Sequence, residues 1–72
     1  LLAVGVRDVI GRFERGDVVN IESGGKVIAK GIPDYDSEDI FRIRGIRSDR
    51  IEAVLGHKSY DDVIRSENLV LM

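Results

Sequence analysis

The residues best suited to do chemistry in this chain are the arginines of its second half. Four of them follow one another closely: Arg42, Arg44, Arg47 and Arg50. Guanidinium groups bind phosphate, so such a row could contact the backbone of an RNA, and this binding would weaken steeply with salt. We treat these four residues as the candidate contact site for RNA or for a protein partner.

A structural explanation of the same arginines competes with this one. An acidic block precedes them, formed by Asp34, Asp36, Glu38 and Asp39. Two of these acids would lie in the first turn of a short helix and Arg42 and Arg44 in its last turn, which complements the helix dipole. Arg47 and Arg50 can pair with neighbouring carboxylates or remain solvated. We favour this explanation, and RNA binding remains the alternative.

Charge and aromatic content give RNA binding little support. The formal net charge is −2 and the pI is about 5.3, the wrong sign for a protein that neutralises phosphates. Recognition of single-stranded RNA also uses exposed aromatic rings. We expect Phe13 and Phe41 in the core, so that only Tyr35 and Tyr60 remain as surface rings. One uninterrupted face made of the four arginines and Lys58 would favour RNA, whereas acids interleaved with them would not.

The sequence contains no pattern typical of catalysis or metal binding. Gly11 and Gly16 match half of a phosphate-binding loop, but Asp17 and Val18 stand where lysine and serine or threonine are needed. There is no cysteine and one histidine, His57, which we assign to a loop or helix cap, so thiolate and multi-histidine metal sites are excluded. We predict no catalytic, cofactor-binding or metal-binding residue within this chain.

The chain is predicted to be organised around a β-hairpin. Two β-branched runs, residues 18–21 and 27–29, flank Gly24-Gly25, a pair that can take the positive φ angles of a type I′ turn. With these glycines as the loop, Ile21 faces Ile28 on one side of the sheet. The predicted structural turn and hairpin positions are Gly16, Asp17, Gly24, Gly25 and Gly31.

Strands are also predicted near both ends of the chain. Residues 2–6 alternate between larger and smaller side chains, as in a half-buried strand, and Gly5 within them marks a bulge or a close backbone approach. Residues 68–72 form an apolar run short enough to be a buried strand. The core residues expected between the first strand and the hairpin are Val9, Ile10 and Phe13.

Short helices are predicted between the hairpin and the last strand. The first follows Pro33, with Asp36 or Ser37 as its N-cap and Gly45 at its end. Its expected apolar stripe is Ile40, Phe41 and Ile43.

A second helix is predicted to end at Gly56. Ser48 or Asp49 would cap it, with Glu52 placed for a reciprocal capping contact. A third helical turn is predicted from Ser59. Strands dominate both ends and the first half, so the expected architecture is a small closed or nearly closed β-barrel.

The length of 72 residues allows one domain with a small core. No apolar run is long enough to span a bilayer, so we expect a cytoplasmic protein without membrane contact. The chain begins at Leu1 instead of methionine, and we interpret residues 1–72 as a single domain excised from a larger protein.

A family pattern covers essentially the whole chain. Its first part is Val4-Gly5-Val6, Gly11-x-Phe13-x-x-Gly16-Asp17-Val18-Val19-x-Ile21 and Gly25-x-x-Ile28-Ala29-x-Gly31, and it resembles the PUA domain, named for pseudouridine synthases and archaeosine transglycosylases. Its second part is Tyr35-x-Ser37-x-Asp39-Ile40-x-x-Ile43-x-Gly45, Ser48-Asp49-x-Ile51-x-x-Val54-Leu55-Gly56 and Asn68-Leu69-Val70. This part resembles the C-terminal PUA domain of the bacterial glutamate 5-kinase family. This chain departs from the family pattern at three places: Ala3 stands where proline is frequent, His57 where tyrosine is common, and Arg65-Ser66-Glu67 where His-Arg-Asp usually precedes Asn-Leu-Val.

The resemblance implies both a fold and a parent enzyme. The fold is mostly β with short helices, a PUA-like small β-barrel (pseudobarrel). The parent would transfer the γ-phosphoryl group of ATP to the side-chain carboxylate of L-glutamate, the first step of proline biosynthesis, in an amino-acid-kinase domain preceding residue 1. ATP and Mg²⁺ would belong to that domain, and the parent is expected to be a homo-oligomer. The PUA domain would be an accessory, with regulation or assembly favoured and RNA binding as the alternative.

Overall fold

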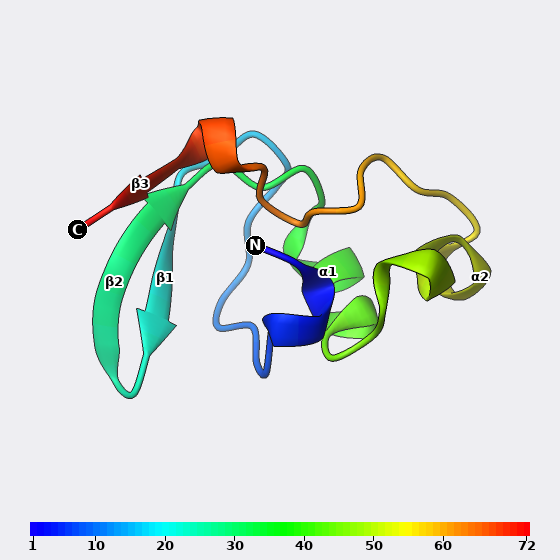
Figure 1. Cartoon of the computed structure of the whole chain (residues 1–72), viewed down its shortest axis with the longest axis horizontal. Helices are drawn as coiled ribbons and strands as arrows, with labels where there is room; N and C mark the ends of the chain where they lie inside the picture. Colours follow the sequence, from blue (N-terminus) through cyan, green and yellow to red (C-terminus); the bar gives the residue numbers. More distant parts are fainter.

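The computed structural model describes residues 1–72, with a small antiparallel sheet at one end and short helices at the other (Figure 1). The strands are β1 (Val19–Ser23), β2 (Lys26–Gly31) and β3 (Leu69–Leu71), in the order β1-β2-β3. The helices are α1 (Ser37–Ile43) and α2 (Ile51–Leu55), with 3-10 turns η1 (Ala3–Gly5), η2 (Ser48–Arg50) and η3 (Ser66–Asn68). None of these helices has the length and apolarity needed to cross a membrane.

β1 and β2 form the predicted hairpin, but its register changes partway along. Gly24 and Gly25 make the turn with φ angles of +59° and +77°, a region that favours glycine. Further from the turn, a β-bulge places Ile21 opposite Ala29. The predicted pairing of Ile21 with Ile28 is therefore wrong. The bulge adds one residue to β2, which returns the small Ala29 to the buried face and leaves Ile28 exposed.

The predicted N-terminal strand is wrong as well. Leu2 makes a single β-bridge to Asp62, and the next residues form η1. Ala3 is fully buried while Leu2 and Val4 are exposed, so the small residue of the alternation faces the core. The close approach expected at Gly5 is absent, because a Cβ there would meet no atom within 4 Å.

The helix α1 begins at the predicted cap. The Asp36 side chain accepts a hydrogen bond from the Asp39 N–H at 2.8 Å. Ile40 and Ile43 are buried, but Phe41 is exposed, contrary to the prediction. Phe41 lies about 100° further around the helix than Ile40. The side of α1 that packs on the core therefore buries Ile40 and leaves Phe41 outside.

The helix α2 continues directly from η2 and ends at Gly56, whose φ is +82°. The predicted capping contact with Glu52 does not form. The Ser48 hydroxyl instead donates to the Asp61 carbonyl at 3.0 Å, and the N-cap residues Arg47 of η2 and Arg50 of α2 make no side-chain capping bond. Ser48 therefore ties η2 to a distant loop and leaves α2 uncapped.

Residues 57–65 are irregular, and the helical turn predicted there does not form. They nevertheless deliver Val63 and Ile64 to the core. The Asp34 N–H donates to the Val63 carbonyl at 2.9 Å, which fixes this segment beside the residues that follow β2. Below, these residues are called the 57–65 segment.

The core lies among the helices, the 57–65 segment and the base of the hairpin. Its buried members are Ala3, Tyr35, Ile40, Ile43, Ile51, Val63 and Ile64. Val9 and Phe13 pack against it as expected, but Ile10 is 78% exposed and does not. β3 forms as predicted, yet Val70 and Leu71 are exposed, so its predicted burial is wrong.

The fold class expected from the sequence, antiparallel strands combined with short helices, is confirmed. The expected closure into a barrel is not complete. The sheet has three strands, and β1 and β3 at its two edges are not paired with each other.

Replacing Gly31 with alanine is expected to lower the free energy of unfolding by about 1–3 kcal/mol. A Cβ at this position would lie 2.8 Å from Cγ2 of the buried Ile64 and 3.2 Å from the Asn68 carbonyl oxygen. Urea unfolding measures the loss. Gly5→Ala is the control, because its Cβ meets nothing within 4 Å. Equal losses in the two variants would contradict tight packing at Gly31.

Candidate functional site

The first two candidate arginines are held against the protein by α1 and the turn after it. Arg42, in the last turn of α1, donates through Nη2 to the Val54 carbonyl at 2.7 Å. Arg44 donates through Nη1 to the Phe41 carbonyl at 2.5 Å, and its guanidinium carbon lies 3.7 Å from the centre of the Phe41 ring. The Arg42 bond joins α1 to α2, and the Arg44 cation–π contact covers one face of an exposed ring.

The other two candidate arginines lie at η2. Arg47 Nη2 is 3.2 Å from Asp49 Oδ2 in an exposed ion pair, while the Arg50 side chain makes no hydrogen bond or ion pair. Lys58 Nζ lies 2.5 Å from Asp61 Oδ1, and this hydrogen bond raises the pKa of the Lys58 ammonium group. Acids therefore lie directly beside two of the basic side chains, although they are not those of residues 34–39.

His57 lies in the loop after α2 and reaches across to α1. Its Nε2 is 3.3 Å from Asp39 Oδ2, and its ring stacks on Tyr35 with the centroids 6.4 Å apart. Asp39 is one member of the acidic block, so this contact brings a carboxylate from α1 to the end of α2. The histidine connects the two helices.

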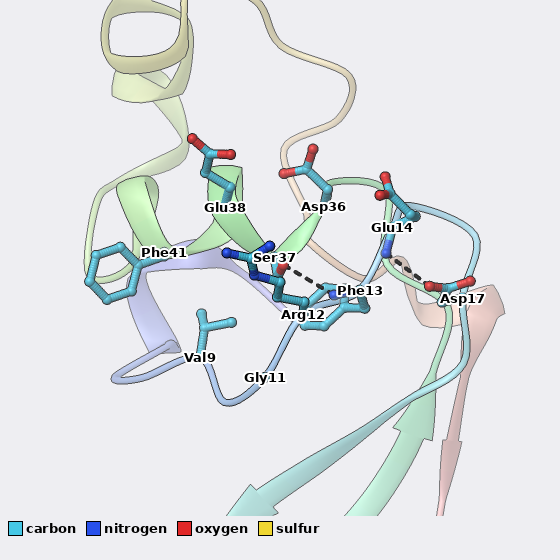
Figure 2. A pocket seen from close by; sticks show the side chains of 10 residues that line it. All are labelled: Val9, Gly11, Arg12, Phe13, Glu14, Asp17, Asp36, Ser37, Glu38 and Phe41. Atoms are coloured by element: carbon cyan, nitrogen blue, oxygen red, sulfur yellow. Dashed lines mark hydrogen bonds between the residues drawn. The ribbon is translucent and has the colours of Figure 1, made fainter.

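A shallow hollow of about 650 Å³ lies between the segment 9–17 and residues 36–41 at α1 (Figure 2). Its carboxylates are Glu14, Asp17, Asp36 and Glu38, against one guanidinium, Arg12. Several polar groups here already serve the fold: the Glu14 N–H donates to Asp17 Oδ2 at 2.9 Å, and the Phe13 N–H donates to the Ser37 hydroxyl at 3.1 Å. Because acids outnumber bases, this hollow disfavours phosphate.

An ion pair between distant residues was not anticipated from the sequence. Asp34 is buried, and Arg65 donates to its two carboxylate oxygens through Nε at 2.9 Å and Nη2 at 3.1 Å. The hydrogen bonding of Arg65 to the Asp34 carboxylate raises the pKa of the Arg65 guanidinium. Arg65 also lies 3.9 Å above the Tyr60 ring. A bidentate pair of this kind fixes both distance and orientation.

The Tyr35 hydroxyl is the second unanticipated contact. It donates to the Tyr60 carbonyl at 2.7 Å and accepts from the backbone N–H groups of Ser59 at 3.0 Å and Tyr60 at 3.2 Å. The expectation that Tyr35 is a surface ring is wrong, because it is buried in the core. A hydroxyl with three partners inside the chain satisfies backbone groups that no strand or helix serves.

The aromatic rings therefore offer little open stacking surface. Tyr35 is buried, Arg65 covers Tyr60, and Arg44 covers one face of Phe41. Sequence reasoning had placed Phe41 inside and Tyr35 outside, and the structure reverses both. A weak signal was available for Tyr35, since it directly precedes the helix cap Asp36.

An open antiparallel sheet and two short helices around one core define this chain as a small modular β+α domain. The family model for the PUA domain matches residues 1–55, and the chain belongs to the PUA domain family. The resemblance inferred from the sequence is confirmed.

Curated relatives extend this comparison. A glutamate 5-kinase from Methanosarcina mazei is 51% identical over 72 residues, which is 100% of this chain and 19% of the relative. A glutamate 5-kinase from Carboxydothermus hydrogenoformans is 47% identical over 100% of this chain, which is 20% of the length of that relative. A glutamate 5-kinase from Methanococcoides burtonii is 45% identical over 99% of this chain, which is 19% of its length. The chain thus spans about a fifth of the length of these relatives.

The variant Tyr35→Phe is expected to lose about 1–3 kcal/mol of unfolding free energy, because it leaves part-buried backbone groups of Ser59 and Tyr60 without this partner. Urea unfolding measures this loss. Tyr60→Phe is the matched control, since the Tyr60 hydroxyl makes no hydrogen bond within the chain, and its midpoint should stay near that of the wild type. A Tyr35→Phe protein as stable as the control would show that the three bonds contribute nothing.

Proposed function

We propose that residues 1–72 are the C-terminal accessory PUA domain of a glutamate 5-kinase and that the domain serves regulation or assembly. The supporting observation is the 51% identity, along the whole of this chain, to a glutamate 5-kinase of which it spans only 19%. The rest of such a protein would hold the catalytic part.

Phosphoryl transfer from ATP to the glutamate side-chain carboxylate belongs, in this proposal, to the kinase part of the longer chain. Several polar side chains of residues 1–72 have structural partners instead. Asp36 caps α1, Asp34 binds Arg65, and the Tyr35 hydroxyl binds backbone groups. ATP and Mg²⁺ would bind on the kinase part, and we assign no residue of this domain to them.

The contacts of the arginines support regulation or assembly over RNA binding. Three of the four guanidinium groups are engaged within the chain, by Val54, Phe41 and Asp49. All four arginines are exposed, but these contacts direct three of them toward protein groups, which leaves them poorly placed to follow a phosphate backbone. A surface of mixed charge suits contact with another protein surface better than contact with a polyanion.

Removing these residues from the parent kinase is expected to leave phosphoryl transfer in place. We expect the proline concentration that half-inhibits the enzyme to change by about 5-fold or more, the usual size of an allosteric coupling, or the oligomeric state to change. Steady-state kinetics with proline, together with analytical ultracentrifugation, measure both. Identical inhibition and identical assembly in the two proteins would count against the proposed role.

RNA binding is the alternative, and two features favour it. Arg50 has no side-chain partner, and the exposed Phe41 ring with Arg44 on it forms a stacked pair. Aromatic rings beside guanidinium groups can hold unpaired bases. The two features lie on different elements, η2 and α1.

A fluorescence titration of the domain with labelled tRNA and a short RNA hairpin tests this alternative. Because most of the arginines are engaged, we expect no saturable binding at about 50 mM salt. Binding that is saturable there, falls steeply at about 200 mM salt and disappears when the four candidate arginines become alanine would replace our proposal with an RNA-binding role.

A further inference from the structure

A second and larger hollow runs along the outer edge of β1. This groove has a volume of about 760 Å³, and its two walls are the segment 5–13 and the strand β1 with the residues flanking it. The two walls follow one another in the chain, blue into cyan in Figure 1. Core residues Ile40, Val63 and Ile64 line it between the walls. The groove is therefore an opening into the core of the domain.

The lining of the groove is more apolar than a solvent-facing surface requires. Hydrophobic side chains make up more than half of its residues, and two of them, Ile10 and Val18, are 78% and 70% exposed. Its charged residues are two arginines and two acids, Arg7, Arg12, Asp8 and Glu22. These charges cancel, so the groove favours neither an anionic nor a cationic ligand. An apolar polypeptide segment fits this chemistry.

The groove also contains an unpaired strand edge. β1 pairs with β2 on one side and with no strand on the other. Side chains from both of its faces line the groove, Val19 and Ile21 from one and Asn20 and Glu22 from the other. Such a lining is expected when a groove follows the edge of a strand, because successive residues point to opposite faces. Free backbone N–H and C=O groups on that edge can pair with an added strand.

We propose that an extended apolar segment of the same polypeptide, from outside these 72 residues, occupies this groove and adds a strand to the edge of β1. The inference rests on the proposed function, because it requires a longer glutamate 5-kinase chain to supply the segment. In the relative from Methanosarcina mazei, the part that matches these 72 residues is 19% of the whole length. The added segment covers Ile10 and Val18, completes the core beside Ile40 and Val63, and makes the PUA domain an integral part of the longer protein.

Hydrogen exchange of the β1 amides in two proteins tests the proposal. One protein is the 72-residue chain, and the other is the full-length kinase that carries it. We expect the amides of Val19–Ser23 on the outer edge to exchange quickly in the short chain and slowly in the full-length protein. Val18→Glu in the full-length protein should restore fast exchange, because a carboxylate cannot be buried in an apolar contact without a partner. Ile10→Glu, on the opposite wall, should do the same.

Val70→Glu is the matched control. Val70 is 67% exposed, close to the 70% of Val18, and lies on β3 away from the groove. It should leave exchange at β1 slow in the full-length protein. Equal exchange rates at β1 in the short and full-length proteins would overturn the proposal.

Two further outcomes are distinguished by separate measurements. If the short chain dimerises in sedimentation and its β1 amides are already protected, the occupant is a second copy and the proposal is wrong. If the full-length protein lacks glutamate 5-kinase activity, the proposed function fails whatever the exchange data show. Protection at β1 in an active kinase supports both.

Discussion

The hydrogen bonds of two consecutive residues, Asp34 and Tyr35, hold the 57–65 segment in place. Backbone groups of that segment have no strand or helix to satisfy them, so the Tyr35 hydroxyl accepts from two N–H groups and donates to one carbonyl. Asp34 holds the guanidinium of Arg65 at the end of the same segment. Val63 and Ile64 reach the core through this arrangement, and η3 and β3 follow it directly. The position of the third strand thus depends on side chains that lie just before α1.

The features predicted from the sequence are those that neighbouring residues determine. The Gly24-Gly25 turn and the Asp36 cap depend on residues at most a few positions apart. The β-bulge, by contrast, depends on which residue of β2 fits the core, and the small Ala29 fits it better than Ile28 does. The partners of Tyr35 lie 24 and 25 residues away, and no local pattern indicates them. The candidate arginines could be found by residue type. The contacts that Arg42 and Arg44 make depend on how α1 and α2 pack, which the local sequence does not determine.

The charged residues show why a basic run in a sequence is weak grounds for nucleic-acid binding. Arg42 joins two helices, Arg44 covers an aromatic ring and Arg47 pairs with Asp49. Each contact directs a guanidinium group toward the protein or toward an acid. A chain of net charge −2 with such pairing presents a mosaic surface, which suits specific contact with other protein surfaces.

The exposed strand β3 has a consequence for contact between copies of this chain. Residues Leu69–Met72 carry no charge and no proline, and they lie on the edge of the sheet. An uncharged edge strand without proline leaves its backbone N–H and C=O groups open to pairing with another strand. The nearest charged gatekeepers are Arg65 and Glu67, and Arg65 is already committed to Asp34. The edge at β3 is therefore the part of this sheet where pairing with another chain meets the least charge repulsion.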